Sequence, residues 1–403
     1  MSDSKIYTGE IPTPQPEVLA TKPKSGQLFI GVPKETSFQE TRVALSPSSV
    51  RLLTGLGNRV LVESEAGMES GFSDLKYSEA GAEIVYETEK IFEANIILKV
   101  APPTPKEIEF LKFNQVLFSP LHLPSMSRAS LQQLINKKIS AIAYEYVKDP
   151  AGYFPIVRIM SEIAGGSAIL IAAEYLSKSS KGKGVLLGGI SALPPAKVVV
   201  LGAGVVGEYV ARSAIGLGAD VRVFDNNLYK LMRLQNNLSR RVYTSVILPN
   251  ILAEELRTAD VVVGAIHAET GRTPIFVTED MVQQMQNGSV IVDVSIDQGG
   301  CIETSELTNH TQPTFVKHGI IHYCVPNIAA RVPHSASRAF SNVITGILSK
   351  AHEYGGFENL LREYPGICHG AYIYRGKLTN QFLSERFDLK YTDIELLMAA
   401  NYG

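Results

Sequence analysis

One stretch, KVVVLGAGVVGEYVARSAIGLGADVRVFDNN (197–227), constrains the fold more than any other part of the chain. An apolar β run leads into Gly202, Gly204 and Gly207, and a helical pattern begins at once. Gly202 permits a tight turn, Gly204 lets the backbone approach a pyrophosphate, and Gly207 allows the helix to pack closely on the strand. The pyrophosphate would accept hydrogen bonds at the amino end of that helix. The stretch therefore predicts a dinucleotide-binding βαβ unit.

Asp225 predicts which dinucleotide is bound. It ends the next apolar run, where a carboxylate can accept hydrogen bonds from the adenosine ribose and would repel a 2′-phosphate. This favours NAD over NADP as the cofactor. The alternative is that the glycines form a simple turn and that Asp225 caps a loop.

Apolar runs alternate with helical patterns along the rest of the chain, which is typical of βα units. The expected strands are 28–32, 59–62, 83–86, 96–100, 116–118 and 140–144, followed by 197–201, 220–224, 261–265, 290–294 and 319–324. Helices are expected from Ser46 with Pro47 at the first position, over 127–137, and over two long stretches, 159–178 and 335–350. The predicted fold class is α/β, with two Rossmann-like doubly wound domains, mainly parallel sheets and two long linking helices.

The two long helices bracket the second series of strands, which suggests one domain inserted into another. We expect a flexible arm over 1–27, a substrate domain formed by 28–155 with 333–403, and an NAD-binding domain over 156–332.

Composition excludes several classes of protein. The 403 residues carry a net charge of −2, which gives no electrostatic footprint for nucleic acid. The sequence shows no signal peptide and no apolar stretch long enough to predict a membrane span. The three cysteines are odd in number and far apart, with no metal-ligand spacing around them, so we expect no disulfide framework, no metal site and a cytoplasmic location.

Seven segments together resemble the family of alanine dehydrogenase and, more distantly, the NAD-binding subunit of proton-translocating transhydrogenase. They are GVPKET with TRVALSP (31–47), ILKV (97–100), FSPLHL (118–123), MSEIAG (160–165), LLGGI with PPAKVVVLGAGVVG (186–207), GSVIVDVSIDQGGCIETS (288–305) and HYCVPNIAARVP (322–333). The resemblance implies a homohexamer of two-domain subunits that oxidises L-alanine reversibly to pyruvate and ammonia with NAD.

The resemblance also implies the site residues. Arg42, Lys99, His122 and Asp297 match the arginine, lysine, histidine and aspartate of the family's RVA, LKV, LHL and IDQGG motifs. Asn327 matches a position that binds substrate. Ser161 and Ile328 match positions that contact the cofactor, where Ile328 replaces the usual methionine.

Each of these residue types suits the chemistry of oxidative deamination. Arg42 can hold the substrate carboxylate in a bidentate fork, and Lys99 can bind the carboxylate or polarise the keto oxygen. His122 can exchange a proton near neutral pH as a general acid or base. Asp297 can orient the attacking water or support the ammonium group.

Some positions depart from the family pattern. The family's arginine after MSEVAG is Gly166, its second lysine after LKV is Ala101, and the NMPG turn reads NIAA (327–330). The cofactor loop 264–275 carries His267 and Arg272 as new polar groups. These changes leave three alternatives open: a transhydrogenase-type NAD(H)-binding subunit, a dehydrogenase for another L-amino acid of lysine or saccharopine type, and a cofactor-sensing protein with an inactive substrate site.

Overall fold

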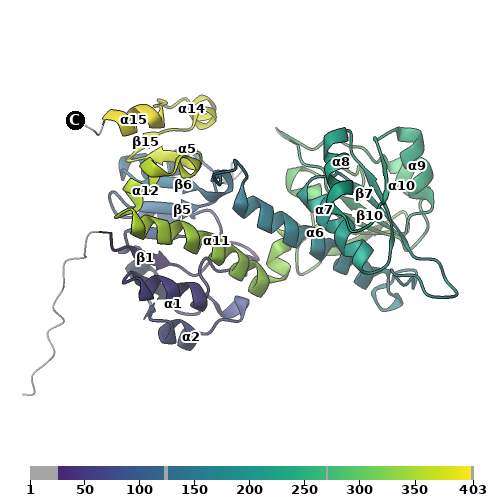
Figure 1. Ribbon diagram of the computed structural model, residues 1–403, viewed down its shortest axis with the longest axis horizontal. Helices are drawn as coiled ribbons and strands as arrows, with labels where there is room; N and C mark the ends of the chain where they lie inside the picture. Colours follow the sequence, from purple (N-terminus) through teal and green to yellow (C-terminus); the bar gives the residue numbers. More distant parts are fainter. Residues whose placement is uncertain (1–25, 122–125, 269–270, 401–403) are drawn as a thin grey trace, which may run out of the picture.

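The structure, a computed structural model, describes residues 26–121, 126–268 and 271–400. Two bodies, each built on one β-sheet, are joined by long helices (Figure 1). We call the part built on the sheet that contains the first strand the first lobe, and the other part the second lobe. His122 lies outside the described residues, as do residues 1–25 of the expected arm.

The first lobe contains an eight-stranded sheet in the order β15-β14-β6-β5-β4-β1-β2-β3. Its strands are β1 (Phe29–Val32), β2 (Arg59–Glu63), β3 (Glu83–Val85), β4 (Ile96–Leu98), β5 (Val116–Ser119), β6 (Ser140–Ala143), β14 (Ala371–Tyr374) and β15 (Lys377–Leu378). The six strands β1 to β6 are parallel, and β14 and β15 add antiparallel strands at one edge. The sheet therefore draws strands from both ends of the chain.

Helices surround this sheet. They are α1 (Pro47–Gly55), α2 (Asp74–Glu79), α3 (Thr88–Ile91), α4 (Pro105–Phe110), α5 (Arg128–Asn136), α11 (Pro333–Glu353), α12 (Phe357–Glu363), α13 (Pro365–Cys368), α14 (Gln381–Phe387) and α15 (Ile394–Ala400). The Ser46 side chain caps α1 by accepting the Ser49 N–H at 3.4 Å, as the sequence predicts.

The second lobe contains a seven-stranded sheet in the order β12-β13-β11-β10-β7-β8-β9. Its strands are β7 (Lys197–Leu201), β8 (Asp220–Phe224), β9 (Tyr243–Ser245), β10 (Val261–Gly264), β11 (Val290–Asp293), β12 (Thr314–Lys317) and β13 (Ile320–Tyr323). The helices are α6 (Pro155–Leu176), α7 (Val205–Gly216), α8 (Leu228–Asn237), α9 (Pro249–Arg257) and α10 (Glu279–Gln283). Only β12 runs antiparallel to its neighbour, in a hairpin whose turn places His318 and Gly319 at positive φ.

Both faces of the second sheet are covered at its centre, which is why the central strands β7, β10 and β11 read as nearly continuous apolar runs. Along β7, Val198 and Val200 pack into one apolar cluster and Val199 and Leu201 into another on the opposite face. The first sheet is likewise flanked by two clusters. The predicted α/β class with two doubly wound, mainly parallel sheets is confirmed.

The helix α6 runs from the first lobe into the second, where it packs on α7 (Figure 1). Its most apolar 18-residue window has a mean hydropathy of 1.6, so the expectation that no stretch is long and apolar enough to cross a membrane was wrong for this helix. The helix links the lobes: 44% of that window is buried inside the protein, where α6 packs against α7 and α11.

A buried histidine in the second lobe makes the fold sensitive to acid. The His322 side chain on β13 is completely buried. Its Nδ1 lies 3.0 Å from the Ile320 carbonyl oxygen, which can only accept, so Nδ1 carries the proton. Its Nε2 then accepts from the Thr304 hydroxyl at 2.8 Å. Burial lowers the pKa of His322 to about 4.

We predict that His322 makes the fold lose stability in acid. The unfolded chain binds the proton from pH 6.5 downward and the folded chain only near pH 4, so the stabilisation is complete above pH 6.5 and is lost as the pH falls toward 4. The loss amounts to at most about 3 kcal/mol. Urea unfolding at pH 7 and pH 4.5 should show a smaller decrease for His322→Gln than for the wild type. Equal decreases in the two proteins would contradict this account.

Candidate active site

The glycine-rich turn after β7 has the geometry that a dinucleotide needs. Gly202 has a φ of +106°, and a Cβ there would lie 2.4 Å from the Ala265 carbonyl oxygen. A Cβ on Gly207 would lie 1.9 Å from the Gly202 carbonyl oxygen. A Cβ on Gly204, by contrast, would meet no protein atom within 4 Å. Two glycines are thus required by the fold, while the third faces open space at the start of α7.

Asp225 braces this turn. Its Oδ2 accepts the Ala203 N–H and its Oδ1 accepts the Asn227 N–H, both at 2.7 Å. Each carboxylate oxygen has a second lone pair, so both can still accept a ribose hydroxyl. The loop-capping alternative and the ribose-binding prediction are therefore compatible.

Asp297 is presented by a short 3-10 turn, Val294–Gln298, at the end of β11. Asp293 anchors this turn: the buried carboxylate accepts hydrogen bonds from the Ser305 hydroxyl at 2.7 Å and from the N–H groups of Cys301 and Ser295 at 3.1 Å. Burial raises the pKa of Asp293 above its usual value although these donors oppose the shift. The sequence analysis missed this supporting carboxylate.

Arg42, in the loop between β1 and α1, is held by a carboxylate that the sequence analysis also missed. Glu40 accepts from Nε at 2.7 Å and from Nη2 at 2.6 Å, while Nη1 lies 3.4 Å from the Met160 Sδ on α6. Burial alone would raise the pKa of Glu40, but the hydrogen bonds and charge of Arg42 reverse the effect and lower it. Glu40 thus occupies the Nε–Nη2 edge of Arg42, so the predicted bidentate fork for a substrate carboxylate would have to form at the Nη1–Nη2 edge.

Lys99, just after β4, has only 1% of its side chain exposed and is bound by two carboxylates. Its Nζ donates to Glu35 Oε2 at 2.9 Å and to Glu107 Oε1 at 2.7 Å. Burial would lower the pKa of Lys99, but the two carboxylates raise it, so the ammonium stays charged. These bonds use two of its three N–H groups, and the third has no partner among the residues that the structure describes.

Asn327, from the second lobe, connects two of the predicted residues. Its Nδ2 donates to Glu40 Oε2 at 3.0 Å, and its backbone N–H donates to Asp297 Oδ1 at 3.2 Å. Asn327 has a φ of +53°, a left-handed conformation that Asn tolerates better than most residues. Arg42, Glu40, Asn327 and Asp297 therefore form one continuous polar chain across the two lobes.

The remaining predicted residues lie near these four hydrogen-bonded residues or outside the described part of the protein. Ser161 is half-buried on α6, directly after Met160, and Ile328 is buried directly after Asn327. His310 lies beside Asn327: burial lowers the pKa of its imidazole, and the Asn327 backbone opposes that shift. The sequence analysis assigned His310 no role, because no spacing signal places it near residue 327.

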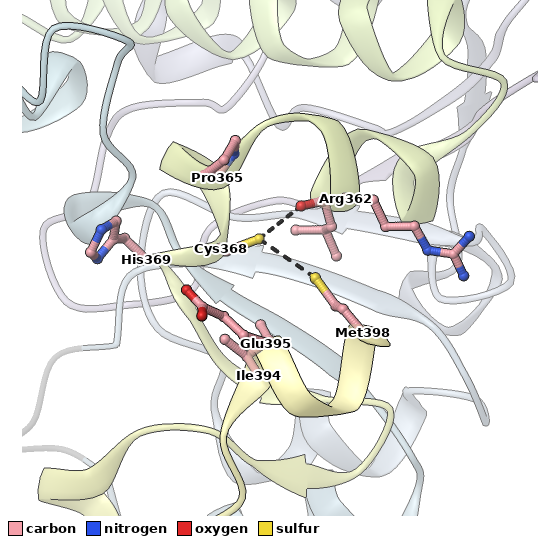
Figure 2. Close-up of a pocket in the computed structure, with 8 residues that line it drawn as sticks. Arg362, Pro365, Cys368, His369, Ile394, Glu395 and Met398 are labelled. Atoms are coloured by element: carbon pink, nitrogen blue, oxygen red, sulfur yellow. Dashed lines mark hydrogen bonds between the residues drawn. The ribbon is translucent and has the colours of Figure 1, made fainter. Parts of the chain in front are cut away.

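A cavity of about 320 Å³ lies elsewhere, between α12, α13 and α15 of the first lobe (Figure 2). Figure 2 shows that Cys368 faces it; the thiol donates to the Leu361 carbonyl oxygen at 2.8 Å and lies 3.9 Å from the Met398 Sδ. None of the predicted site residues lines this cavity. The cavity lies where α15 packs on the first lobe and is not part of the candidate active site.

Comparison with known proteins agrees with this geometry. Residues 31–164 match the family model "Alanine dehydrogenase/PNT, N-terminal domain", and residues 168–381 match its C-terminal domain. The chain belongs to the alanine dehydrogenase/PNT family. Alanine dehydrogenase 2 of Staphylococcus aureus (strain USA300) is 39% identical to it over 368 residues, which cover 91% of this chain and 98% of the relative.

Solved structures of the family have the same fold. One titled L-alanine dehydrogenase superposes with a TM-score of 0.83 at 39% identity, covering 89% of this chain and 99% of that one. A transhydrogenase from Sinorhizobium meliloti superposes with a TM-score of 0.74 at 25% identity, covering 88% and 99%. The predicted resemblance is confirmed, and the chain is an enzyme of this oxidoreductase family.

The glycines provide a test of the nucleotide site. We predict that Gly204→Ala folds normally but weakens dinucleotide binding by about tenfold or more, because the new methyl group enters space that only a ligand would fill. Gly207→Ala should instead fail to fold stably, since its Cβ cannot coexist with the Gly202 carbonyl. Thermal unfolding and fluorescence titration with NADH measure both effects. Unchanged NADH affinity in Gly204→Ala would show that the nucleotide binds elsewhere.

Proposed function

We propose that the protein catalyses the reversible reaction of L-alanine, NAD and water to pyruvate, ammonium, NADH and a proton. The observation that supports it most strongly is the polar chain from Arg42 through Glu40 and Asn327 to Asp297. It joins a cation suited to a carboxylate and an anion suited to an ammonium group. An α-amino acid carries these two charged groups on the same carbon atom.

We propose that the first lobe, with 28–155 and 333–403, binds the substrate, and that 156–332 bind the dinucleotide. The open space over Gly204, the amino end of α7 and the carboxylate of Asp225 fit a dinucleotide there. NAD, when bound, supplies the hydride acceptor. Ser161 and Ile328 would border its nicotinamide.

The protein's own groups bind and orient the substrate. Arg42 keeps three N–H groups beyond those used by Glu40, enough for a bidentate bond to the substrate carboxylate. The third N–H of Lys99 would donate to a substrate oxygen. The positive charge of the ammonium then stabilises the negative charge that develops on the keto oxygen when pyruvate is reduced. Asn327 assists in holding the carboxylate.

Proton transfer is assigned to His122, and Asp297 supports it. His122 would remove the proton as water adds to the α-carbon, because an imidazole exchanges protons near neutral pH. Asp297 would hold the ammonium group or the attacking water, since its carboxylate is fixed by the Asn327 N–H.

We propose that the active form is a homo-oligomer, a hexamer by resemblance, in the cytoplasm. The segment 153–193, which contains α6, supports association because it exposes many large apolar side chains that a second copy would bury. They are Tyr153, Phe154, Val157, Leu170, Leu186, Ile190 and Leu193.

The direct test is a screen of L-amino acids with NAD, followed by NADH absorbance. Turnover with alanine supports the proposal. Turnover with lysine or saccharopine alone would assign another substrate. Absence of turnover with every amino acid, together with hydride exchange between NAD(H) and a second nucleotide, would assign a transhydrogenase role.

We predict that Asp225 sets the preference for NAD over NADP. Asp225→Asn keeps the shape and one acceptor for the turn but removes the charge that repels a 2′-phosphate, so the ratio of kcat/KM for NAD to that for NADP should fall by roughly tenfold. Asp225→Ser, which also loses the bond to Ala203, should additionally raise the KM for NAD. An unchanged ratio in both variants would assign the discrimination to another residue.

We predict that His122→Ala lowers kcat by ~10²–10⁴-fold while NADH affinity stays the same, because a positioned proton-transfer group is worth that much. The control is His310→Ala, which removes the imidazole beside Asn327 and should cost less than about tenfold. The pair is compared by steady-state kinetics and NADH titration. A larger loss in His310→Ala than in His122→Ala would transfer the acid–base role to His310.

A further inference from the structure

Glu40 is a carboxylate that accepts four hydrogen bonds where the two lobes meet. Only 5% of its side chain is exposed. Oε1 accepts the Nε–H of Arg42 at 2.7 Å and its backbone N–H at 3.0 Å. Oε2 accepts from Nη2 of Arg42 at 2.6 Å and from Nδ2 of Asn327 at 3.0 Å. A carboxylate offers about four acceptor positions, so Glu40 has none left for a substrate.

These bonds fix which edge of Arg42 is available. A guanidinium has two edges that can grip a carboxylate, Nε–Nη2 and Nη1–Nη2. Glu40 occupies the first. Among the described residues, the second edge has one acceptor, the weakly accepting Met160 Sδ at 3.4 Å from Nη1. A substrate carboxylate therefore finds a cation that is already oriented, with its end edge open.

The same carboxylate reaches the second lobe through Asn327, and its sequence neighbours make separate contacts. Gln39 accepts the His310 N–H at 2.8 Å and donates to the Thr311 hydroxyl at 2.9 Å. The Thr41 hydroxyl donates to the Ala330 carbonyl oxygen at 2.8 Å. Three consecutive residues thus bond across the lobes, but only the middle one also holds the predicted substrate cation.

We propose that Glu40 is a positioning residue that couples substrate binding to nucleotide binding. Glu40 holds Arg42 and Asn327 together. The orientation of the Nη1–Nη2 edge of Arg42 therefore depends on the position of the second lobe. Nucleotide bound to that lobe should therefore tighten the binding of the substrate carboxylate through Glu40. This inference rests on the proposed function, because it takes alanine and pyruvate as the ligands of Arg42.

The test measures the affinity for pyruvate by calorimetry, with and without saturating NAD. No hydride can pass between pyruvate and NAD, because both are the oxidised partners of the reaction. The wild type should bind pyruvate more tightly with NAD. In Glu40→Gln this enhancement should nearly disappear, and the KM for alanine should rise by about tenfold or more, the worth of a charge-assisted hydrogen bond. NAD affinity without pyruvate should stay within about twofold, since the proposed nucleotide site lies on the second lobe and Glu40 on the first.

Thr41→Val is the matched control. It removes an adjacent bond between the lobes and leaves Arg42 untouched, so the enhancement should change by less than about twofold. Asn327→Ala should lose the enhancement as Glu40→Gln does, and the double variant should lose little more, since the two residues act as one unit. Where Glu40→Gln unfolds at the assay temperature, Glu40→Asp, which keeps the charge but shortens its reach, replaces it.

The inference is overturned when Glu40→Gln keeps both the enhancement and the KM, or when Thr41→Val loses as much as Glu40→Gln. The second result would assign the coupling to docking of the lobes in general. A wild type that binds pyruvate with NAD but does not oxidise alanine would overturn the proposed function and leave the coupling measurement intact.

Discussion

The buried carboxylate of Glu40 ties the predicted substrate cation Arg42 to the second lobe, and the arrangement of the candidate site depends on it. An anion removed from water needs compensating charge and donors, and Glu40 obtains them from Arg42 in its own lobe and from Asn327 in the other. Lys99 is a buried cation that needs compensating negative charge, and two carboxylates around its ammonium group supply it. The charges of the candidate site are thus held in place before any substrate arrives, which is the condition for electrostatic preorganisation.

Most of the fold could be predicted because local patterns and long-range packing agree. The strands 197–201 and 220–224 were predicted to the residue. Val198–Leu201 form an unbroken buried apolar run, and in the second strand Val221, Val223 and Phe224 are buried beside the half-buried Arg222. Strands β9, β12, β14 and β15 were missed. Tyr243–Ser245, Thr314–Lys317 and Lys377–Leu378 lie at sheet edges and carry polar residues, and β14 joins its sheet through a pairing more than 200 residues away, which no local pattern can indicate.

The types of residue in the candidate site could be predicted from the sequence. Which charged residues pair with one another was harder to predict. The glycines and Asp225 follow from spacing along one βαβ unit, and their geometry is as expected. Arg42 and Lys99 were recognised as cations, but their partners Glu40, Glu35 and Glu107 were not. A sequence shows that a buried lysine needs an anion without showing which carboxylate the folded chain brings to it. His310 was missed for the same reason.

The central claim is that Glu40 holds one edge of Arg42 while the substrate carboxylate takes the other. A crystal structure of the complex with NAD and pyruvate tests it most directly. The account predicts that the pyruvate carboxylate binds the Nη1–Nη2 edge of Arg42, with Glu40 still on Nε and still bonded to Asn327. Pyruvate on the Nε–Nη2 edge with Glu40 displaced, or pyruvate bound away from Arg42, would contradict it.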